Sequence, residues 1–295
     1  MRADAAVLPG AHARSRDFVA LAKPRLNLLV VASTLVGYAM ANGEPLGFLR
    51  IGGMLLGTGL VAGGASAFNQ VIERDLDALM KRTRMRPLAD QRLQPTEGVL
   101  FGTAITLAGL LMIVVSANLL AAAVALATLL SYVVVYTPLK RRSSFGTVIG
   151  AIPGALPPMI GWAAATSALP PQAWTLFGIM FLWQLPHFLA IAWMYRDDYA
   201  RAGFPMLPVL EPDGRSTGRQ AVLYAAALVP LSLAPTLMGM AGPVYFGGAF
   251  VLGLVFLWLT LQFARTRSVG DARRVFLFSI IYLPLVWILM IADKI

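Results

Sequence analysis

Long apolar segments recur along this chain and are separated by short polar stretches. Nine of them approach the ~20 residues that an α-helix needs to cross a bilayer; they span residues 26–43, 48–69, 96–116, 118–137, 145–166, 172–194, 219–240, 244–264 and 273–292. The pattern predicts an all-α, polytopic membrane bundle of nine transmembrane helices. We expect residues 1–22 to form a disordered N-terminal tail and residues 23–295 to form one helical domain.

Basic residues fall on one side of this bundle. Of the 24 Lys and Arg residues, 22 lie in the N-terminal segment or in the loops after the second, fourth, sixth and eighth segments. Only Arg50 and Lys294 lie opposite. The positive-inside rule then places the N-terminus and these loops in the cytoplasm and the C-terminus outside. Residues 1–25 lack the apolar region of a signal peptide, so we expect a multi-pass protein of the bacterial inner membrane.

Composition narrows the chemistry. Hydrophobic residues make up 58% of the chain and charged residues 13%, against about 25% charged in a typical soluble domain. The one-sided distribution of basic residues explains the net charge of +10 without a nucleic-acid partner. The chain has no cysteine, which excludes disulfides, thiol catalysis and Cys-ligated metals.

The most informative polar stretch runs from Phe68 to Leu88. Asn69, Glu73 and Asp77 are spaced by four, so on a helix they stack on one face about 6 Å apart. Asp75 is rotated by about 160° from both Glu73 and Asp77. Polar groups at the end of a membrane span are costly and usually functional. Oxygen ligands without Cys or a nearby His favour Mg²⁺. We predict that the ladder of three binds Mg²⁺ and that Asp75 is an accessory or structural charge.

Basic residues follow this ladder and also end the fourth segment. Lys81, Arg82 and Arg84 belong to the first group, and Lys140 and Arg141 to the second. Bases after a span often only set topology, but Lys and Arg also clamp phosphates. We predict that these five residues bind a diphosphate carried by the metal.

Two further features could complete the site. Asp197 and Asp198 end the sixth segment, where they form either a second metal site or a polar loop exit; Asp198 is the better ligand, although the spacing does not decide between them. His187 is the only histidine outside the tail and lies about three helical turns earlier. A hydrogen-bonded core histidine is the usual role, but inside a membrane such residues face the bundle interior. Its partner could be a second substrate, an axial metal position or a transferred proton.

The fifth segment carries glycines at a spacing of four. Gly146, Gly150 and Gly154 would share one helix face, which permits close packing against a neighbouring helix.

These residues together resemble the UbiA superfamily of intramembrane prenyltransferases, whose first acidic motif maps onto Asn69, Glu73 and Asp77. Gln70 stands where many members have an acid, and Glu73 replaces the more usual Asp. Three strings, NQVIERDLDALMKRTRMRPL, YTPLKRRSSFGTVIGAIPGALPPMIGW and WQLPHFLAIAWMYRDDYARAGFPMLPV, are similar to the branch of the family that prenylates haem. The likeness extends from Lys23 to the C-terminus.

The resemblance implies nine helices around a central cavity and a Mg²⁺-dependent transfer of the farnesyl group of farnesyl diphosphate to the 2-vinyl group of haem b, giving haem O for terminal oxidases. It implies catalytic roles for Asn69, Glu73, Asp77 and His187. A haem A synthase or oxidase assembly factors would be partners by the same resemblance, although no residue here argues for one. Two alternatives stay open: a family member with an aromatic or quinone-precursor acceptor, and a membrane transporter of a phosphate-bearing ligand.

Overall fold

The computed structural model describes residues 11–43 and 45–295, with side chains from residue 14 onward. All of its regular secondary-structure elements are helices, and no strand occurs in the described part of the chain. In order they are α1 (Ala11–Ala22), α2 (Pro24–Met40), α3 (Phe48–Leu79), α4 (Pro95–Ser116), α5 (Leu119–Leu130), the π-helix η1 (Ser131–Tyr136), α6 (Thr137–Leu139), α7 (Gly146–Ala155), α8 (Pro157–Thr166), α9 (Pro171–Met194), α10 (Arg196–Arg201), α11 (Leu207–Leu210), α12 (Arg215–Leu237), α13 (Pro243–Thr266) and α14 (Val269–Ala292).

Local sequence signals set the ends of several helices. Proline occupies the first turn of α2, α4, α9 and α13, where its missing N–H costs no hydrogen bond. Asn118 caps α5 by accepting from the backbone N–H of Ala121 at 2.9 Å, and Ser268 caps α14 in the same way. Short connections join α4 to α5 at residues 117–118 and α12 to α13 at residues 238–242.

The helices bear out an integral membrane bundle. Among the described residues, eight helical spans are long and apolar enough to cross a bilayer, and a ninth is obtained when α1 and α2 count as one span bent by 40°. Pro24 causes this bend because it cannot continue the hydrogen bonds of α1, and Lys23 before it adopts a left-handed conformation with φ of 47°. The nine predicted segments correspond to these elements, and α3 continues helically ten residues past the predicted end at residue 69.

The N-terminal tail differs from the prediction of disorder. Residues 11–22 form α1, whose Leu21 is fully buried against Ala67, Leu88 and Leu93. Asp17 is buried and pairs with Arg92 in the loop after α3. The apolar side of this short helix thus has a packing partner that the local sequence does not reveal. The rest of the predicted tail, residues 1–10, lies outside the described residues.

The glycine face of α7 packs as the spacing predicts. A Cβ atom on Gly150 would lie 2.5 Å from the ring of Tyr136, and one on Gly154 would collide with the side chain of Gln184 on α9. Small residues here let α7 approach both η1 and α9. The packing sets the position of Tyr136, which the candidate site uses.

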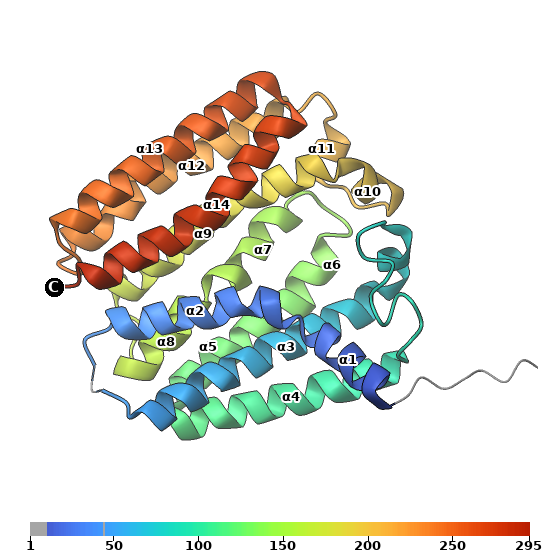
Figure 1. Cartoon of the computed structure of the whole chain (residues 1–295), viewed down its shortest axis with the longest axis horizontal. Helices are drawn as coiled ribbons and strands as arrows, with labels where there is room; N and C mark the ends of the chain where they lie inside the picture. The colour runs from blue at the N-terminus through green and yellow to red at the C-terminus, as the bar shows by residue number, and fades with distance from the viewer. Residues whose placement is uncertain (1–10, 44) are drawn as a thin grey trace, which may run out of the picture.

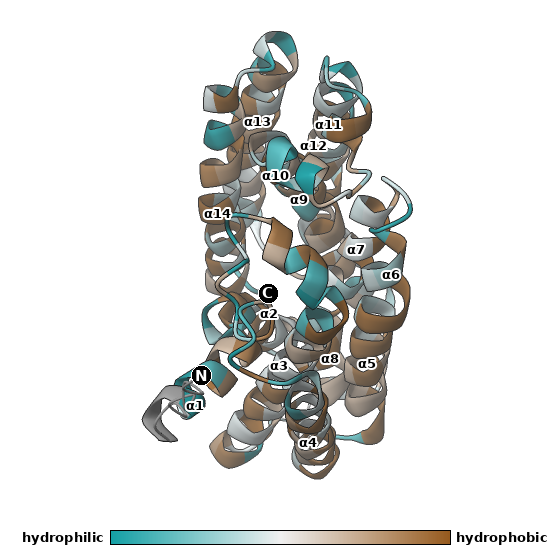
Figure 2. Cartoon of the chain, turned by 90° about the vertical axis from the view of Figure 1, so that its right-hand side faces the viewer, coloured by the Kyte–Doolittle hydropathy of each residue, from teal (hydrophilic) through white to brown (hydrophobic). Residues whose placement is uncertain are grey.

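One end of the bundle collects the loops that carry the basic residues. The loop after α3, the short helices α6, α10 and α11, and helix α1 all lie at the right-hand end of the molecule in Figure 1, opposite the C-terminus. Viewed from that end, α10 and the loops are largely hydrophilic, whereas α4 and α5 are mostly hydrophobic (Figure 2). A polar site reached from this end therefore lies above an apolar bundle.

Candidate functional site

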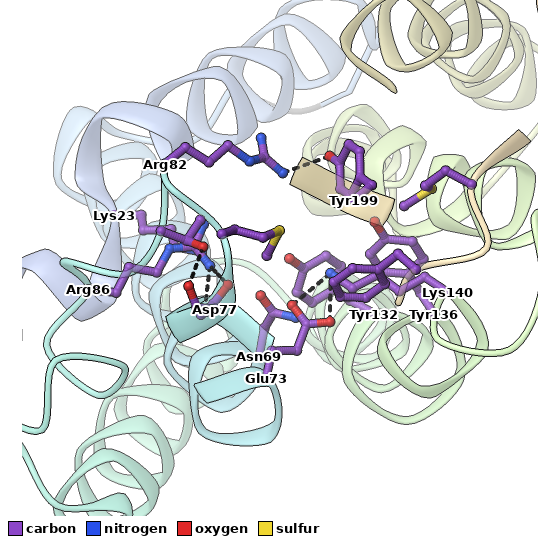
Figure 3. A pocket seen from close by; sticks show the side chains of 14 residues that line it. Lys23, Asn69, Glu73, Asp77, Arg82, Arg86, Tyr132, Tyr136, Lys140 and Tyr199 are labelled. Carbon is purple, nitrogen blue, oxygen red and sulfur yellow. Dashed lines mark hydrogen bonds and ion pairs between the residues drawn. The ribbon is translucent and has the colours of Figure 1, made fainter. Parts of the chain in front are cut away.

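A polar cavity of about 130 Å³ opens at this end of the bundle. It lies between the end of α3, the loop that follows, the η1–α6 segment and the connection from α10 to α11 (Figure 3). Its lining consists of Lys23, Asn69, Glu73, Asp77, Met80, Arg82, Thr83, Arg86, Tyr132, Tyr136, Lys140, Tyr199, Phe204 and Met206. Segments more than a hundred residues apart in sequence thus meet around one space.

The three-residue ladder of α3 lies on one wall of the cavity. Asn69, Glu73 and Asp77 are each at most 2% exposed and all line the space. Asp75 points away: its side chain is 85% exposed and pairs with Arg74 at 3.2 Å. The helical geometry therefore separates Asp75 from the other three, as the spacing predicts. Their role as metal ligands stays a prediction.

Both acids of the ladder face a base. The Nζ atom of Lys140 lies 2.7 Å from each carboxylate oxygen of Glu73, although only the contact to Oε2 has hydrogen-bond geometry. Arg86 Nη1 donates to both oxygens of Asp77, at 2.8 and 2.7 Å. Figure 3 shows these pairs on opposite sides of the ladder. Each base therefore holds its carboxylate in a fixed orientation at the wall of the cavity.

The amide of Asn69 is oriented by a hydroxyl. Thr137 is fully buried, and its hydroxyl donates to the backbone oxygen of Tyr132 at 2.8 Å. A hydroxyl has a single proton to donate, so Thr137 accepts from Asn69 Nδ2, 3.3 Å away. The Asn69 oxygen is thereby left for the cavity side, where an oxygen ligand is useful.

The π-helix η1 explains how two tyrosines reach the cavity. The backbone N–H of Thr137 bonds to the oxygen of Tyr132, five residues back, and Pro138 has no N–H with which to restore the α-helical pattern. Tyr132 and Tyr136 both line the cavity, with ring centroids 5.4 Å apart. Lys140 Nζ lies 5.1 Å from the centroid of Tyr136, so this ring already presents its face to a cation.

The five predicted diphosphate ligands separate into two groups. Arg82 and Lys140 line the cavity, and Arg82 donates to the Tyr199 hydroxyl at 2.6 Å. Lys81, Arg84 and Arg141 are exposed and do not line it. These three predictions differ from the structure. Lys81 and Arg84 follow the end of α3 at Met80, and Arg141 follows the end of α6 at Lys140, so helical spacing no longer governs where these side chains point.

Two other bases occupy the cavity in their place. Lys23 precedes the proline that begins α2, and Arg86 belongs to the same basic stretch as Arg82. Arg86 could have been predicted from its place in the basic stretch. For Lys23 the sequence offers no signal beyond its position before proline. The lining therefore holds four basic side chains and two carboxylates, an excess of basic groups suited to a multiply charged anion.

The second acidic group does not reach the cavity. Asp197 is 90% exposed, and Asp198 is mostly buried in an ion pair with Arg201 on the same short helix. The α10 residue that lines the cavity is Tyr199. The metal-ligand prediction for Asp198, and the less favoured one for Asp197, are thus not supported by their positions. Successive side chains on a helix are rotated by about 100°, so Tyr199 faces the cavity while its neighbour Asp198 does not.

An apolar pocket adjoins the polar cavity. Its lining includes Phe188, Ile191 and Ala192 of α9 together with Thr147, and it shares Tyr136, Tyr199 and Met206 with the polar cavity. His187 lies next to this wall but does not line either space; its Nδ1 atom is 2.7 Å from Ser279 Oγ on α14. The site thus has a charged chamber and an apolar chamber that share three side chains.

The donor atoms of the ladder suit a hard divalent cation. Within the described residues, no three His, Cys, Asp or Glu side chains gather to bind a metal. Asn69, Glu73 and Asp77 supply two carboxylates and an amide oxygen, and Glu73 Oε1 is buried without a hydrogen-bond partner. Mg²⁺ commonly takes one or two carboxylates and completes its shell with water and substrate phosphate. The residues therefore fit Mg²⁺ that arrives with a phosphorylated ligand.

Comparison with known proteins agrees with this architecture. The chain is 46% identical to a protein named protoheme IX farnesyltransferase from Solibacter usitatus, over 95% of this chain and 99% of that protein. A solved digeranylgeranylglyceryl phosphate synthase has a TM-score of 0.79 at 16% identity and covers 94% of this chain and 97% of its own. A UbiA homologue from Archaeoglobus fulgidus bound to GPP and Mg²⁺ has a TM-score of 0.66 at 17% identity and covers 93% and 99%.

The family model completes this comparison. The model of the UbiA prenyltransferase family matches residues 30–282, which include the acidic ladder, η1, and helices α7 to α13. This match confirms the family resemblance inferred from the three sequence strings and favours prenyl transfer over transport of a phosphate-bearing ligand. The multi-helix architecture, the family match and the similarity to the relative from Solibacter usitatus together show that the chain belongs to the UbiA prenyltransferase family.

Proposed function

We propose that the protein transfers the farnesyl group of farnesyl diphosphate to the 2-vinyl group of haem b, giving haem O for terminal oxidases. The observation that carries this proposal is the two-part site, in which a cavity lined by four bases and two acids shares three side chains with an apolar pocket. The relative from Solibacter usitatus supports the choice of donor and acceptor through its name.

The basic residues of the cavity bind the diphosphate. Arg82, Arg86, Lys140 and Lys23 surround the space and donate to phosphate oxygens, with Arg86 and Lys140 held in place by Asp77 and Glu73. Stabilising the charge that develops on the leaving diphosphate lowers the barrier to breaking the bond between C1 and oxygen. The exposed Lys81, Arg84 and Arg141 attract the anion to the membrane surface without touching it.

Asn69, Glu73 and Asp77 would hold Mg²⁺, which when bound supplies further positive charge to the diphosphate. The UbiA homologue bound to GPP and Mg²⁺ supports this choice of metal. The ligand set excludes Asp197 and Asp198, which face other partners.

The tyrosine rings and the apolar pocket receive the organic part of the reaction. Tyr136 lines both spaces, and its electron-rich ring stabilises the positive charge developing on the farnesyl group. Apolar walls keep water from this electrophile until the vinyl carbon of haem attacks C1. Water then adds to the cation left on the porphyrin side chain and loses a proton, which gives the hydroxyl group of the product.

The membrane setting follows from the same proposal. The proposal puts the cavity at the cytoplasmic face of a bacterial inner membrane, where farnesyl diphosphate and Mg²⁺ are available, and the C-terminus outside; the one-sided distribution of basic residues supports this orientation. Haem b, like the farnesyl chain, reaches the site from the lipid bilayer. Haem A synthase and oxidase assembly factors are candidate recipients of the product.

A direct assay tests the proposal. Purified protein in lipid nanodiscs is incubated with haem b, farnesyl diphosphate and Mg²⁺, and the haem is examined by chromatography and mass spectrometry. We expect a more hydrophobic haem whose mass gain equals one farnesyl group plus one hydroxyl group, and none with Glu73→Gln. Pyrophosphate release with unaltered haem, or prenylation of 4-hydroxybenzoate or a naphthoate in its place, would show that the acceptor is a different one.

A further inference from the structure

A hydrogen-bonded pair connects α9 and α14 beside the apolar pocket. His187 Nδ1 lies 2.7 Å from Ser279 Oγ, and the Ser279 hydroxyl donates to the backbone oxygen of Phe276 at 2.6 Å. Because that hydroxyl has only one proton, it must accept at the histidine. In the neutral imidazole, Nδ1 therefore carries the proton and Nε2 keeps a free lone pair.

The lone pair on Nε2 of His187 has no partner among the described residues. Nε2 of His187 makes no hydrogen bond to any described residue and is not among the fully enclosed polar atoms. A polar atom inside an apolar bundle is costly to leave unpaired. The arrangement therefore leaves a ligand atom available beside the site.

The imidazole ring is also held rigidly. Trp183 stacks on it with centroids 5.4 Å apart and an interplanar angle of 26°, and Phe276 lies 5.1 Å away. Trp183 Nε1 donates to the backbone oxygen of Ser279 at 2.8 Å, so the same residue of α14 positions both rings. A ligand fixed in both orientation and tautomer is preorganised for metal binding.

The position on α9 relates this histidine to the reaction site. His187 lies one helical turn before Ile191, on the same face. Ile191 lines the apolar pocket, which shares Tyr136 and Tyr199 with the diphosphate cavity. The order along the helix is therefore the charged chamber, the apolar pocket and then, deeper in the bundle, His187.

We propose that His187 Nε2 ligates the iron of the porphyrin acceptor and that Ser279 positions it by fixing its tautomer. This inference rests on the proposed function, which makes an iron porphyrin the acceptor. With no cysteine in the chain, an imidazole is the strongest available ligand for haem iron. His187 precedes Phe188 and Ile191, which line the apolar pocket, so a porphyrin held at its Nε2 would lie beside that pocket. A histidine that only ties α9 to α14 would have no preference for iron.

The test compares haem b with metal-free protoporphyrin IX as probes. Both are titrated into the full chain in nanodiscs for the wild type, His187→Ala, Ser279→Ala and Ser279→Thr. We expect His187→Ala to weaken haem binding by at least about tenfold and to leave binding of the metal-free porphyrin unchanged, with added imidazole restoring the iron spectrum. Ser279→Ala should weaken haem binding by about tenfold, and Ser279→Thr, which keeps the hydroxyl, should restore most of it.

A labelling experiment identifies the ligand without any variant in its site. Protein grown with ¹⁵N-histidine is reduced, bound to haem b and nitric oxide, and examined by electron paramagnetic resonance. The nitrogen of an axial imidazole adds a hyperfine splitting to the resonance of the iron–nitrosyl group. Replacing ¹⁴N by ¹⁵N in histidine changes the number and spacing of these lines. The chain has two histidines, so His12→Ala is the matched control and should keep the signal.

The outcomes separate this inference from the proposed function. An imidazole signal that depends on His187 supports the inference. Wild-type protein that makes the farnesylated haem but shows no imidazole nitrogen on the iron would overturn it and leave the proposed function intact, as would equal losses of haem and metal-free porphyrin in His187→Ala. Iron ligation by His187 without farnesyl transfer would uphold the ligand assignment and count against the proposed function.

Discussion

Replacing Asp77 by Asn is the most direct test of the acidic ladder. The substitution preserves shape and leaves one oxygen for the hydrogen bond from Arg86 Nη1, which lies 2.8 and 2.7 Å from the two carboxylate oxygens. What it removes is one negative charge on a side chain that is 1% exposed. If Asp77 binds Mg²⁺, this charge stabilises the metal and, through it, the diphosphate.

The expected loss is large in activity and small in stability. Two unit charges about 4 Å apart at an effective dielectric constant of about 20 interact by about 4 kcal/mol. Since about 1.4 kcal/mol corresponds to a factor of ten, kcat/KM should fall by about 10³. Breaking a fully buried ion pair costs about 3–5 kcal/mol, but the side chain of Arg86 is 27% exposed and Asn keeps part of the contact, so we expect about 1 kcal/mol of folding stability to be lost.

The measurement is pyrophosphate release and prenylated product as a function of Mg²⁺ concentration, with thermal unfolding recorded for the same samples. Asp75→Asn is the matched control, because it makes the same exchange two residues away on α3 at a side chain that is 85% exposed. The control should keep wild-type activity and Mg²⁺ dependence.

Wild-type turnover by Asp77→Asn at both limiting and saturating Mg²⁺ would refute the reasoning. An equal loss in Asp75→Asn would show instead that the whole charge of α3, and not the ladder, matters.

Three further predictions concern the support of the site. Thr137→Val should leave the Asn69 amide unpaired at a cost of about 1–3 kcal/mol and weaken Mn²⁺ binding measured by electron paramagnetic resonance, whereas Thr137→Ser should restore it. Gly150→Ala should lower the unfolding temperature, since its Cβ would lie 2.5 Å from a tyrosine ring and overpacking costs about 1–3 kcal/mol; Gly247→Ala, which meets nothing within 4 Å, should not. Asp17→Asn should speed hydrogen exchange in α1, and unchanged exchange would show that this ion pair does not dock the helix.

The parts of the site that lie on one helix could be predicted from sequence. Asn69, Glu73 and Asp77 share a face because their spacing matches the helical repeat, and Asp75 is turned away for the same reason. The glycine spacing of α7 predicted close packing by the same geometry. These are local relations, and a continuous helix enforces them regardless of what surrounds it.

The pairing of charges could not be predicted in this way. Lys140 meets Glu73 across 67 residues of sequence, while Arg141, next to it and equally basic, faces solvent. Likewise Tyr199 and not Asp198 lines the cavity. Neighbouring residues in short helices and loops point in different directions, and only the packing of the segments selects one.

The sequence alone therefore determined the membrane architecture, the sidedness of its charges, the family and the ladder of α3, since hydrophobic length, charge distribution and helical spacing act locally. Only the tertiary structure decided which bases face the ladder, that residues 11–22 form α1, and that Ser279 lies within hydrogen-bond distance of His187. Those features depend on contacts between segments that are distant in the sequence. The free energy of such contacts comes from burying side chains together, and the local pattern of residues does not predict it.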